Sequence, residues 1–241
     1  MDYNGWMGKQ EKAAETLDLL KRAIQGGLSR AYSTVQIDSQ AYLQHLRRAH
    51  GLPILGYRDM FRLPVAALDH VATQTISSSK KVAALEGAGV GLGGMLTVLP
   101  DISLLAIIAM RMLQKLSLIY GFEYATDEDV VHLWIAAGTA AGLDLGRDIV
   151  EKEVVERFVP RIMERVAARM GAEVAEKWAG RLIPVLSGAI GGTLNYYFIR
   201  SWGRRAQEHF RVRHLMQRQL ELVEPSYREL RSGSGTPLLP S

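Results

Sequence analysis

The sequence predicts an all-α protein, a single compact multi-helix domain with two glycine-rich apolar core helices. Three observations support this fold class. No segment alternates apolar and polar residues over more than a few positions, as a strand with one buried face would. Apolar residues recur at helical spacing instead, and prolines and glycines stand where helices would begin and end. A chain of 241 residues is long enough to bury one large core.

Residues 1–61 are predicted to form an N-terminal helical extension. Residues 9–49 have helical character with a weak point at Gly26-Gly27, and residues 51–64 form a connector punctuated by glycine and proline. The next helix is expected to open near Pro64, with residues 77–81 turned to solvent. Its mixed apolar face contains Val65, Leu68, Val71, Ile76, Val82 and Leu85.

Two signals delimit the following helix. Pro100 suits the first turn of a helix, where its missing N–H is among donors that have no partner anyway, so a helix is expected over residues 101–120. Gly121 can adopt the left-handed conformation common at helix ends and should stop it. Residues 125–129 then resemble a capping box, with Thr126 and Asp129, and open a further helix over residues 130–143.

A stripe of apolar residues, one every fourth position, predicts a long helix after residue 154. Because four residues advance about 400° around a helix, this stripe winds and needs more than one neighbour to cover it. Pro160 is expected to kink this helix. The stripe consists of Val154, Phe158, Ile162, Val166, Met170, Val174, Trp178 and Leu182. The last helix is expected to start at Pro184 and end near Val223, so the main helical domain is predicted over 62–223 and a flexible tail over 224–241.

Composition excludes several classes of function. The chain has no cysteine, so it has no disulfide and no thiolate nucleophile. Its histidines do not recur at i, i+4, and neither GxSxG nor HExxH is present, so no catalytic residue, metal site or cofactor is predicted. The net charge of +4 is too small to indicate nucleic-acid binding. The N-terminus lacks the pattern of a secretory signal, and a cytoplasmic location is therefore expected.

Glycines dominate two stretches of the sequence. Gly89-x-Gly91-x-x-Gly94 formally matches a dinucleotide fingerprint, but no strand is predicted before it and no acid follows at the required distance. Glycines at spacings of three to four can instead let two helices approach closely, or they can form turns. The candidates for close helix packing are Gly87, Gly91, Gly94, Gly188, Gly191 and Gly192.

The same two regions are nearly free of charge. Residues 87–110 contain one charged residue, Asp101, and residues 182–199 contain none, so each is long enough to cross a bilayer. The prolines, the many glycines and the cost of burying Asp101 favour core helices or a re-entrant hairpin over a membrane span.

A small set of polar residues falls within or beside these apolar regions. The candidates for buried polar positions are Asp101, Arg111, Tyr120 and Asn195. Asp101 either caps a helix or pairs with a cation from another helix, because an isolated buried carboxylate is very costly. The alternative is a catalytic acid in an internal pocket, with Arg111 or Tyr120 as its partner.

Basic residues follow the second apolar region. Residues 200–218 contain six arginines and one acid, Glu208. Aromatic residues followed by arginines are typical of a cytoplasmic membrane face, although a basic helical stretch can also be simply solvated. The candidates for contact with a membrane or an anion are Tyr196, Arg200, Arg204 and Arg205.

Two blocks, GAGVGLGG…LPDISLLAIIAMRMLQKLSLIYGFEY and IPVLSGAIGGTLNYYFIRSWGRRAQEHFRVRHL, resemble the signature blocks of the EcsC family. The resemblance covers about residues 62–220, with one departure: Pro100 precedes Asp101, whereas the family often has the acid first. The family is named after a bacterial protein encoded beside the subunits of an ABC transporter, and it has no established activity. The resemblance therefore implies a bacterial, cytoplasmic protein peripheral to the inner face of the cell membrane.

These observations lead to one main hypothesis. The chain is expected to be a non-enzymatic helical protein that acts at the cytoplasmic membrane face, where it either associates with an ABC transporter or binds a lipid or acyl chain. The alternatives are a hydrolase-like enzyme with an internal pocket around Asp101 and a purely structural interaction module. The expected partners are a membrane surface or lipid and ABC-transporter subunits, with no nucleic acid and no predicted oligomeric state.

Overall fold

The computed structural model confirms the all-α prediction: within its described part every regular element is a helix. The structure describes residues 15, 18, 19, 21–29, 37–90, 95–124, 127–143, 155–179 and 187–232, and it leaves out the side chains of 86–90, 95–102, 127–128, 155–159, 173–179, 187–191, 194 and 221–232. The elements are α2 (Ser39–His50), η1 (Tyr57–Arg62), α3 (Val65–Val90), α4 (Met95–Ile119), α5 (Asp127–Ala140), α6 (Val155–Ala179) and α7 (Ser187–Ser232).

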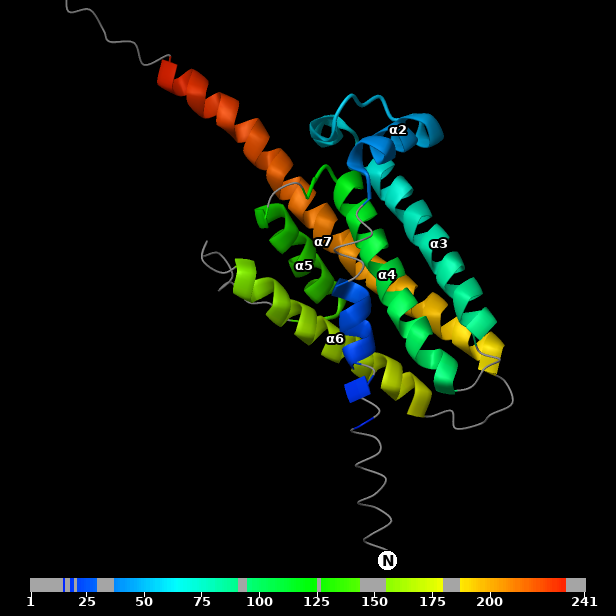
Figure 1. Cartoon of the computed structure of the whole chain (residues 1–241). Coiled ribbons are helices and arrows are strands. Elements are labelled where there is room, and N and C mark those ends of the chain that lie inside the picture. The colour runs from blue at the N-terminus through cyan, green and yellow to red at the C-terminus, as the bar shows by residue number, and fades with distance from the viewer. Residues whose placement is uncertain are drawn as a thin grey trace, which may run out of the picture.

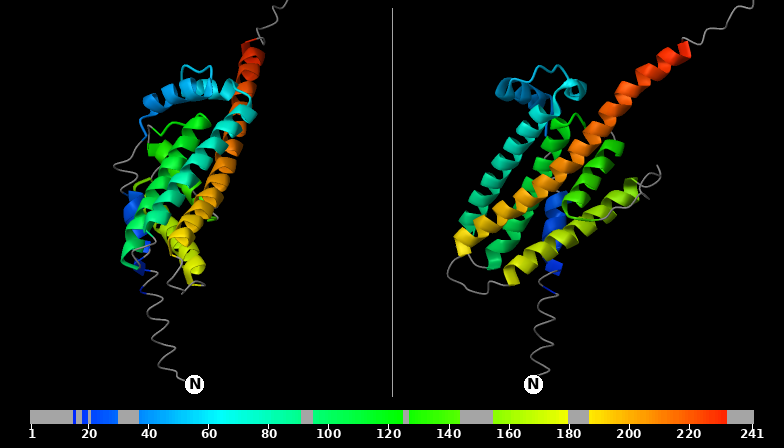
Figure 2. Two further views of the ribbon diagram at one scale, coloured as in Figure 1. Left: turned by 90° about the vertical axis from the view of Figure 1, so that its right-hand side faces the viewer. Right: turned by 180° about the vertical axis from the view of Figure 1, so that it is seen from behind.

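The longest helices share one bundle. Helices α3 and α7 lie side by side over much of their length, α4 packs against both, and α5 joins α7 to α6 (Figure 1). Helix α2 and η1 lie at the end of the bundle where α3 begins, and the C-terminal part of α7 projects beyond the other helices (Figure 2). The core therefore lies between α3, α4, α5 and α7.

The weak point predicted at Gly26-Gly27 does not interrupt the helix. Residues 21–29 form a helix that includes both glycines, and Ile37 and Asp38, directly before α2, are not helical. There the Asp38 carboxylate accepts hydrogen bonds from the backbone N–H groups of Gln40 (2.9 Å) and Ala41 (3.0 Å). Such a cap supplies acceptors for the first N–H groups of α2, which explains why this helix starts afresh.

Glycine is required at position 27 because this helix packs closely against α4. A Cβ atom at this position would lie 2.6 Å from the backbone oxygen of Ser103 on α4. The Ser103 hydroxyl also donates to the carbonyl of Ala23 over 3.0 Å, and Ile24 and Leu28 are completely buried. The described part of the predicted extension is thus integrated into the bundle core.

The connector and the start of α3 follow the prediction. Residues 51–64 contain η1, and α3 begins at Val65, directly after Pro64. On its predicted apolar face, Leu68, Val71 and Ile76 are buried, whereas Val82 and Leu85 are 48% and 75% exposed. Of the run at residues 77–81, Ser78 and Lys81 are exposed and the others are half-buried.

Helix α4 starts earlier than predicted. It begins at Met95, so Pro100 is its sixth residue and not part of its first turn. The first four N–H groups of a helix have no partner within it, so this proline removes only one bond, the one to the carbonyl of Leu96. The predicted end is confirmed, because Gly121 has φ of 90° directly after the last turn.

The remaining helices agree with the pattern in part. Helix α5 begins and ends three residues before the predicted range of 130–143, and Thr126 of the expected capping box is outside the described residues. Pro160 lies inside α6 and is exposed. Ile162, Val166 and Met170 of the apolar stripe are buried, and its other members have no described side chain.

The last helix is longer than predicted. Helix α7 runs to Ser232, nine residues beyond the expected end at Val223, and includes Pro225. The first nine residues of the predicted tail are therefore helical. Among the described residues, no helix has both the length and the hydropathy required to cross a bilayer.

Candidate functional site

The glycines predicted to allow close helix contact are only partly visible. Gly192 is buried on α7, whereas Gly91 and Gly94 lie outside the described residues. The surroundings of Gly87, Gly188 and Gly191, in helices α3 and α7, are also not described. A close glycine contact between α3 and α7 is described elsewhere: a Cβ at Gly203 would lie 2.9 Å from two side-chain atoms of Ile76.

The predicted polar residues do not form one site. Asp101 and Tyr120 lie near opposite ends of α4, about 28 Å apart by helix rise, so they cannot share a pocket. Arg111 lies between them and is exposed. Asn195 is buried on α7, and the side chain of Asp101 is outside the described residues.

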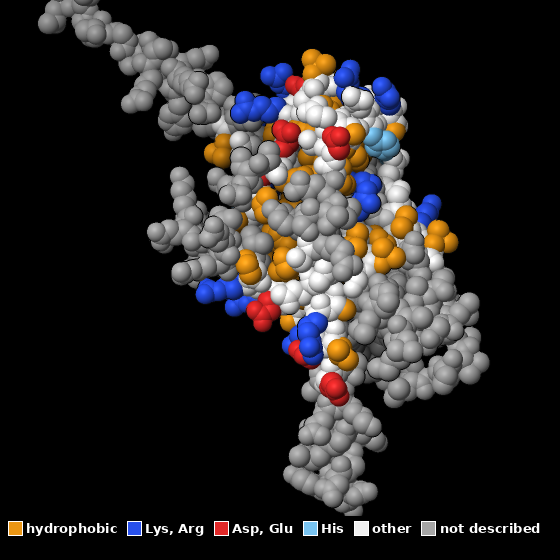
Figure 3. Space-filling view, viewed as in Figure 1, with side chains coloured by type: hydrophobic (Ala, Val, Ile, Leu, Met, Phe, Trp, Pro, Cys, Tyr) orange, Lys and Arg blue, Asp and Glu red, His pale blue; other side chains and the backbone are white. Residues whose placement is uncertain are grey.

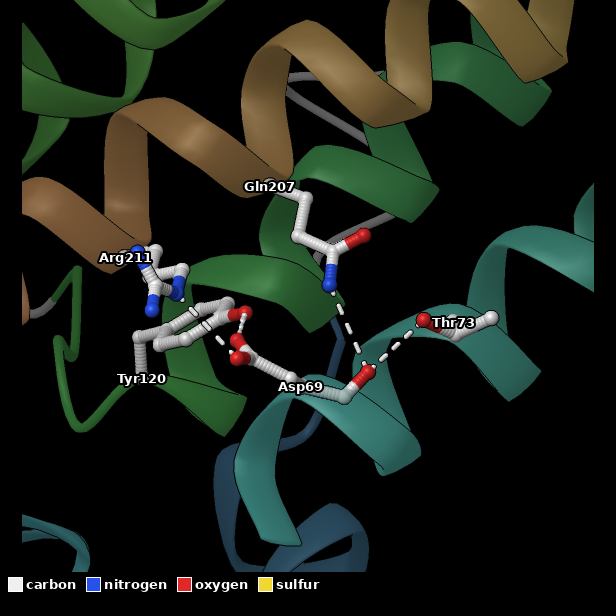
Figure 4. A network of polar contacts seen from close by, with 5 residues as sticks. All are labelled: Asp69, Thr73, Tyr120, Gln207 and Arg211. Atoms are coloured by element: carbon white, nitrogen blue, oxygen red, sulfur yellow. Dashed lines mark hydrogen bonds and ion pairs between the residues drawn. The ribbon is translucent and has the colours of Figure 1, made fainter. Parts of the chain in front are cut away.

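Tyr120 belongs to a different polar group, the Asp69 cluster, which consists of Asp69, Tyr120, Gln207, Arg211 and His214. The Tyr120 hydroxyl donates to Oδ1 of Asp69 over 2.6 Å, and Nε of Arg211 pairs with Oδ2 over 3.1 Å. Gln207 donates to the backbone carbonyl of Asp69 over 3.3 Å (Figure 4). One carboxylate on α3 thus links the end of α4 to the middle of α7.

His214 extends this cluster into the core. Its side chain is completely buried, and its Nδ1 lies 2.9 Å from the backbone oxygen of Tyr120. The imidazole stacks on Phe61 of η1 with ring centroids 4.8 Å apart. The cluster therefore fastens η1 as well as α3, α4 and α7.

The Asp69 cluster holds helices together and is poorly suited to catalysis. Both carboxylate oxygens of Asp69 are engaged, so this side chain is poorly placed to remove a proton from a substrate. Burial and the hydrogen bond to Asp69 raise the pKa of Tyr120, which keeps this phenol a neutral donor. In the described part of the chain, no three acidic or histidine side chains gather where they could hold a metal ion.

A second group of polar residues lies on α3 and α7, and most of its side chains are basic. Lys80 on α3 lies over the ring of Tyr196 on α7, with Nζ 4.8 Å from the ring centroid. A hydrogen bond from Lys80, helped by the charges of Arg200 and Lys81, lowers the pKa of the Tyr196 phenol. We call Lys80, Lys81, Tyr196 and Arg200 the basic patch.

The patch lies in acid-free stretches of its two helices; Glu86 follows on α3, and its side chain is not described. Residues 70–85 of α3 and residues 187–207 of α7 contain no Asp or Glu. Large apolar side chains close to it in the sequence are also exposed: Tyr197 is 54% exposed, in addition to Val82 and Leu85. In Figure 3, apolar and basic side chains lie together on the right-hand flank of the molecule, whereas acidic and basic side chains mix near α2.

Of the predicted membrane-facing residues, three lie at least partly at the protein surface and one points into the bundle. Tyr196 and Arg200 are half-buried members of the patch, and Arg204 is exposed one turn further along α7. The Nε and Nη2 atoms of Arg205, in contrast, are buried. Arg205 therefore points into the bundle.

Sequence reasoning missed Asp69 and the two lysines as site residues. Asp69 is the only acid between Asp59 and Glu86, and an acid on a mainly apolar helix signals a buried pair. Lys80 and Lys81 were assigned to solvent because their pattern matches an ordinary polar face. Only the packing of α3 on α7 shows that they lie beside Tyr196.

Comparisons with known proteins agree with the resemblance. The model of the EcsC protein family matches residues 11–215, which includes most of residues 1–61. Protein EcsC of Bacillus subtilis (strain 168) is 30% identical over 167 residues, 68% of this chain and 71% of that protein. No solved structure matches the chain. The chain therefore belongs to the EcsC protein family.

Proposed function

We propose that this protein binds the surface of an anionic membrane through the basic patch. The observation that carries the proposal is the pairing of Lys80 with Tyr196 in a part of α3 and α7 that has cations but no acids. Lys81 and Arg200 add two positive charges at the same place. In this arrangement the cations meet lipid phosphates, and Tyr196 lies at the level of the headgroups.

The energetics favour a peripheral attachment. Each Lys or Arg near an anionic bilayer contributes about 1 kcal/mol, so three cations give about 3 kcal/mol at low salt. Exposed Val82, Leu85 and Tyr197 add apolar area that can enter the interface. Charge and apolar contact together form the two signals that stable surface attachment requires.

The catalytic alternative has less support. The described polar groups near Tyr120 hold the helices together, and Asp101 lies at the other end of α4. Binding of an acyl chain, location at the cytoplasmic face and association with ABC-transporter subunits stay predictions from the sequence and from the family resemblance.

Vesicle flotation tests the proposal. The protein is mixed with vesicles of phosphatidylcholine alone or with phosphatidylserine added, and we expect it to float only with the anionic vesicles. Replacing both lysines, Lys80→Glu with Lys81→Glu, should abolish flotation because it places negative charge beside the lipid phosphates. Raising the salt concentration should weaken flotation of the unmodified protein.

A matched control reverses a neighbouring pair of cations elsewhere. Arg47 and Arg48 are exposed on α2, at the other end of the bundle, so Arg47→Glu with Arg48→Glu makes the same change in net charge. This variant should still float. Equal losses in both variants, or no flotation of the unmodified protein with anionic vesicles, would contradict the proposal.

A further inference from the structure

The cations of the basic patch converge on one point of the surface, the phenol oxygen of Tyr196. Lys80 hydrogen-bonds this phenol, and the charges of Lys80, Arg200 and Lys81 act on it in the same direction, so together they lower its pKa. Because the attraction between charges weakens with distance, cations that act on the same oxygen lie close around it. The patch is therefore a point of concentrated positive charge and not a diffuse basic surface.

The surroundings of Tyr196 differ from those of the buried tyrosines. Burial raises the pKa of Tyr42, Tyr57, Tyr120 and Tyr124, because the environment of these side chains disfavours a negative charge. The phenol of Tyr196 experiences the opposite influence. An anionic oxygen placed beside it is stabilised by the same cations.

The three cations keep their charge within the described part of the chain. None of Lys80, Lys81 and Arg200 pairs there with a carboxylate. The Nζ of Lys80 lies 4.8 Å from the ring centroid of Tyr196, a neutral side chain that leaves the charge of the ammonium group uncompensated. Lys81 is exposed and Arg200 is half-buried, so both can reach a bound anion.

A concentrated positive charge discriminates among anionic lipid headgroups. A phosphate monoester carries about 1.5 to 2 negative charges at neutral pH on three terminal oxygens. A phosphate diester carries a single negative charge, spread over fewer terminal oxygens. Ammonium and guanidinium groups form their strongest hydrogen bonds to such ionised oxygens. The monoester therefore matches converging cations better than a diester does.

We propose that the basic patch selects lipids whose headgroup is a phosphate monoester, as in phosphatidic acid, over lipids whose headgroup is a phosphate diester. This selection rests on the proposed membrane binding and names the lipid that the patch binds most tightly. The terminal phosphate oxygens contact Lys80, Lys81 and Arg200. Because the Tyr196 oxygen accepts the hydrogen bond from Lys80, its own O–H can donate to the phosphate.

Vesicle flotation with two lipids that differ in this group tests the selection. One set of vesicles contains phosphatidic acid in phosphatidylcholine, and the other contains phosphatidylglycerol, a diester, at about twice the mole fraction, so that its charge is at least equal. At neutral pH and equal salt we expect at least about fivefold tighter binding to phosphatidic acid, because the monoester offers an additional charge-assisted contact. Equal binding to both sets would overturn the selection and leave membrane binding intact, whereas binding to neither would overturn both.

Matched variants show whether the patch causes the selection. Lys81→Gln removes one exposed cation and leaves the others to hold the protein on either vesicle, so the preference for phosphatidic acid should fall at least about twofold. Arg200→Gln should act in the same way. Arg47→Gln removes one exposed cation from α2, at the other end of the bundle, and should keep the full preference. A preference that survives in both patch variants, or that falls equally in Arg47→Gln, would overturn the proposal.

Discussion

The Asp69 cluster and the basic patch lie on the same two helices but use charge in opposite ways. At the cluster, the single Asp69 carboxylate accepts a hydrogen bond from Tyr120, at the end of α4, and pairs with Arg211 of α7. At the patch, eleven residues further along α3, Lys80 and Lys81 lie near Tyr196 and Arg200, and neither residues 70–85 of α3 nor residues 187–207 of α7 contain an acid. Charge satisfied within the chain stabilises the bundle, and charge left unbalanced is available to a partner.

Both regions depend on the packing of the helical bundle. The neighbouring glycines Gly26 and Gly27 test one part of this packing, the contact of residues 21–29 with α4. Gly27→Ala should lower the free energy of unfolding by about 2–4 kcal/mol, because its Cβ would overlap the Ser103 backbone. Nothing lies within 4 Å of a Cβ at Gly26, so Gly26→Ala should be neutral or stabilise by up to about 1 kcal/mol. Urea unfolding measures both, and equal effects would contradict the packing of residues 21–29 on α4.

Removing the carboxylate of the cluster should produce the next largest effect. Asp69→Ala is expected to lower the free energy of unfolding by about 2 kcal/mol, because the Tyr120 hydroxyl and the Arg211 guanidinium both lose their acceptor. Lys80→Ala should change it by less than about 1 kcal/mol, since a single half-buried cation–π contact contributes little to the fold. A Lys80→Ala variant destabilised as much as Asp69→Ala would remove the distinction between the two regions.

An effect of similar size is expected from His209, which lies on α7 between Gln207 and Arg211 of the Asp69 cluster. Burial, with help from the nearby charges of Arg213 and His132, lowers the pKa of His209 to about 4. The unfolded chain then binds more protons between pH 4 and 6.5, so the stability from neutral His209 is lost as the pH falls through this range. After allowance for partial exposure, the loss amounts to about 2 kcal/mol.

The His209 effect can be isolated by comparing unfolding of the parent and His209→Gln at several pH values. Because glutamine does not titrate, the difference in unfolding free energy between the two proteins should change across this range. The parent should gain stability relative to the variant as the pH rises. A constant difference would show that His209 is protonated equally in the folded and unfolded chains.

Local signals in the sequence predicted much of the fold. Pro64 and Gly121 mark helix ends because proline and glycine act through their own backbone geometry. Pro100 misled the prediction, since the cost of one missing hydrogen bond near a helix start is small enough for packing to override. The break at Ile37 and Asp38 was missed because Asp38 resembles any other polar residue until its carboxylate is seen to cap α2.

The site was harder to predict than the fold. Tyr120 was recognised as a polar residue in an apolar region, but its partner Asp69 is 51 positions away and Arg211 is 142 positions from Asp69. Periodicity places a residue on a face of its own helix and does not show which helix covers that face. The aromatic and basic residues of α7 were found from sequence, whereas Lys80 and Lys81 required the packing of α3.

The most direct measurement of membrane contact uses a fluorescent label whose emission shifts to shorter wavelength in an apolar environment. The cysteine-free chain accepts the label uniquely at Leu85→Cys beside the basic patch or at Leu55→Cys in the connector, two positions that are 75% and 83% exposed. Anionic vesicles should shift the emission at position 85 and leave position 55 unchanged. No shift at position 85, or an equal shift at both, would contradict membrane binding through the basic patch.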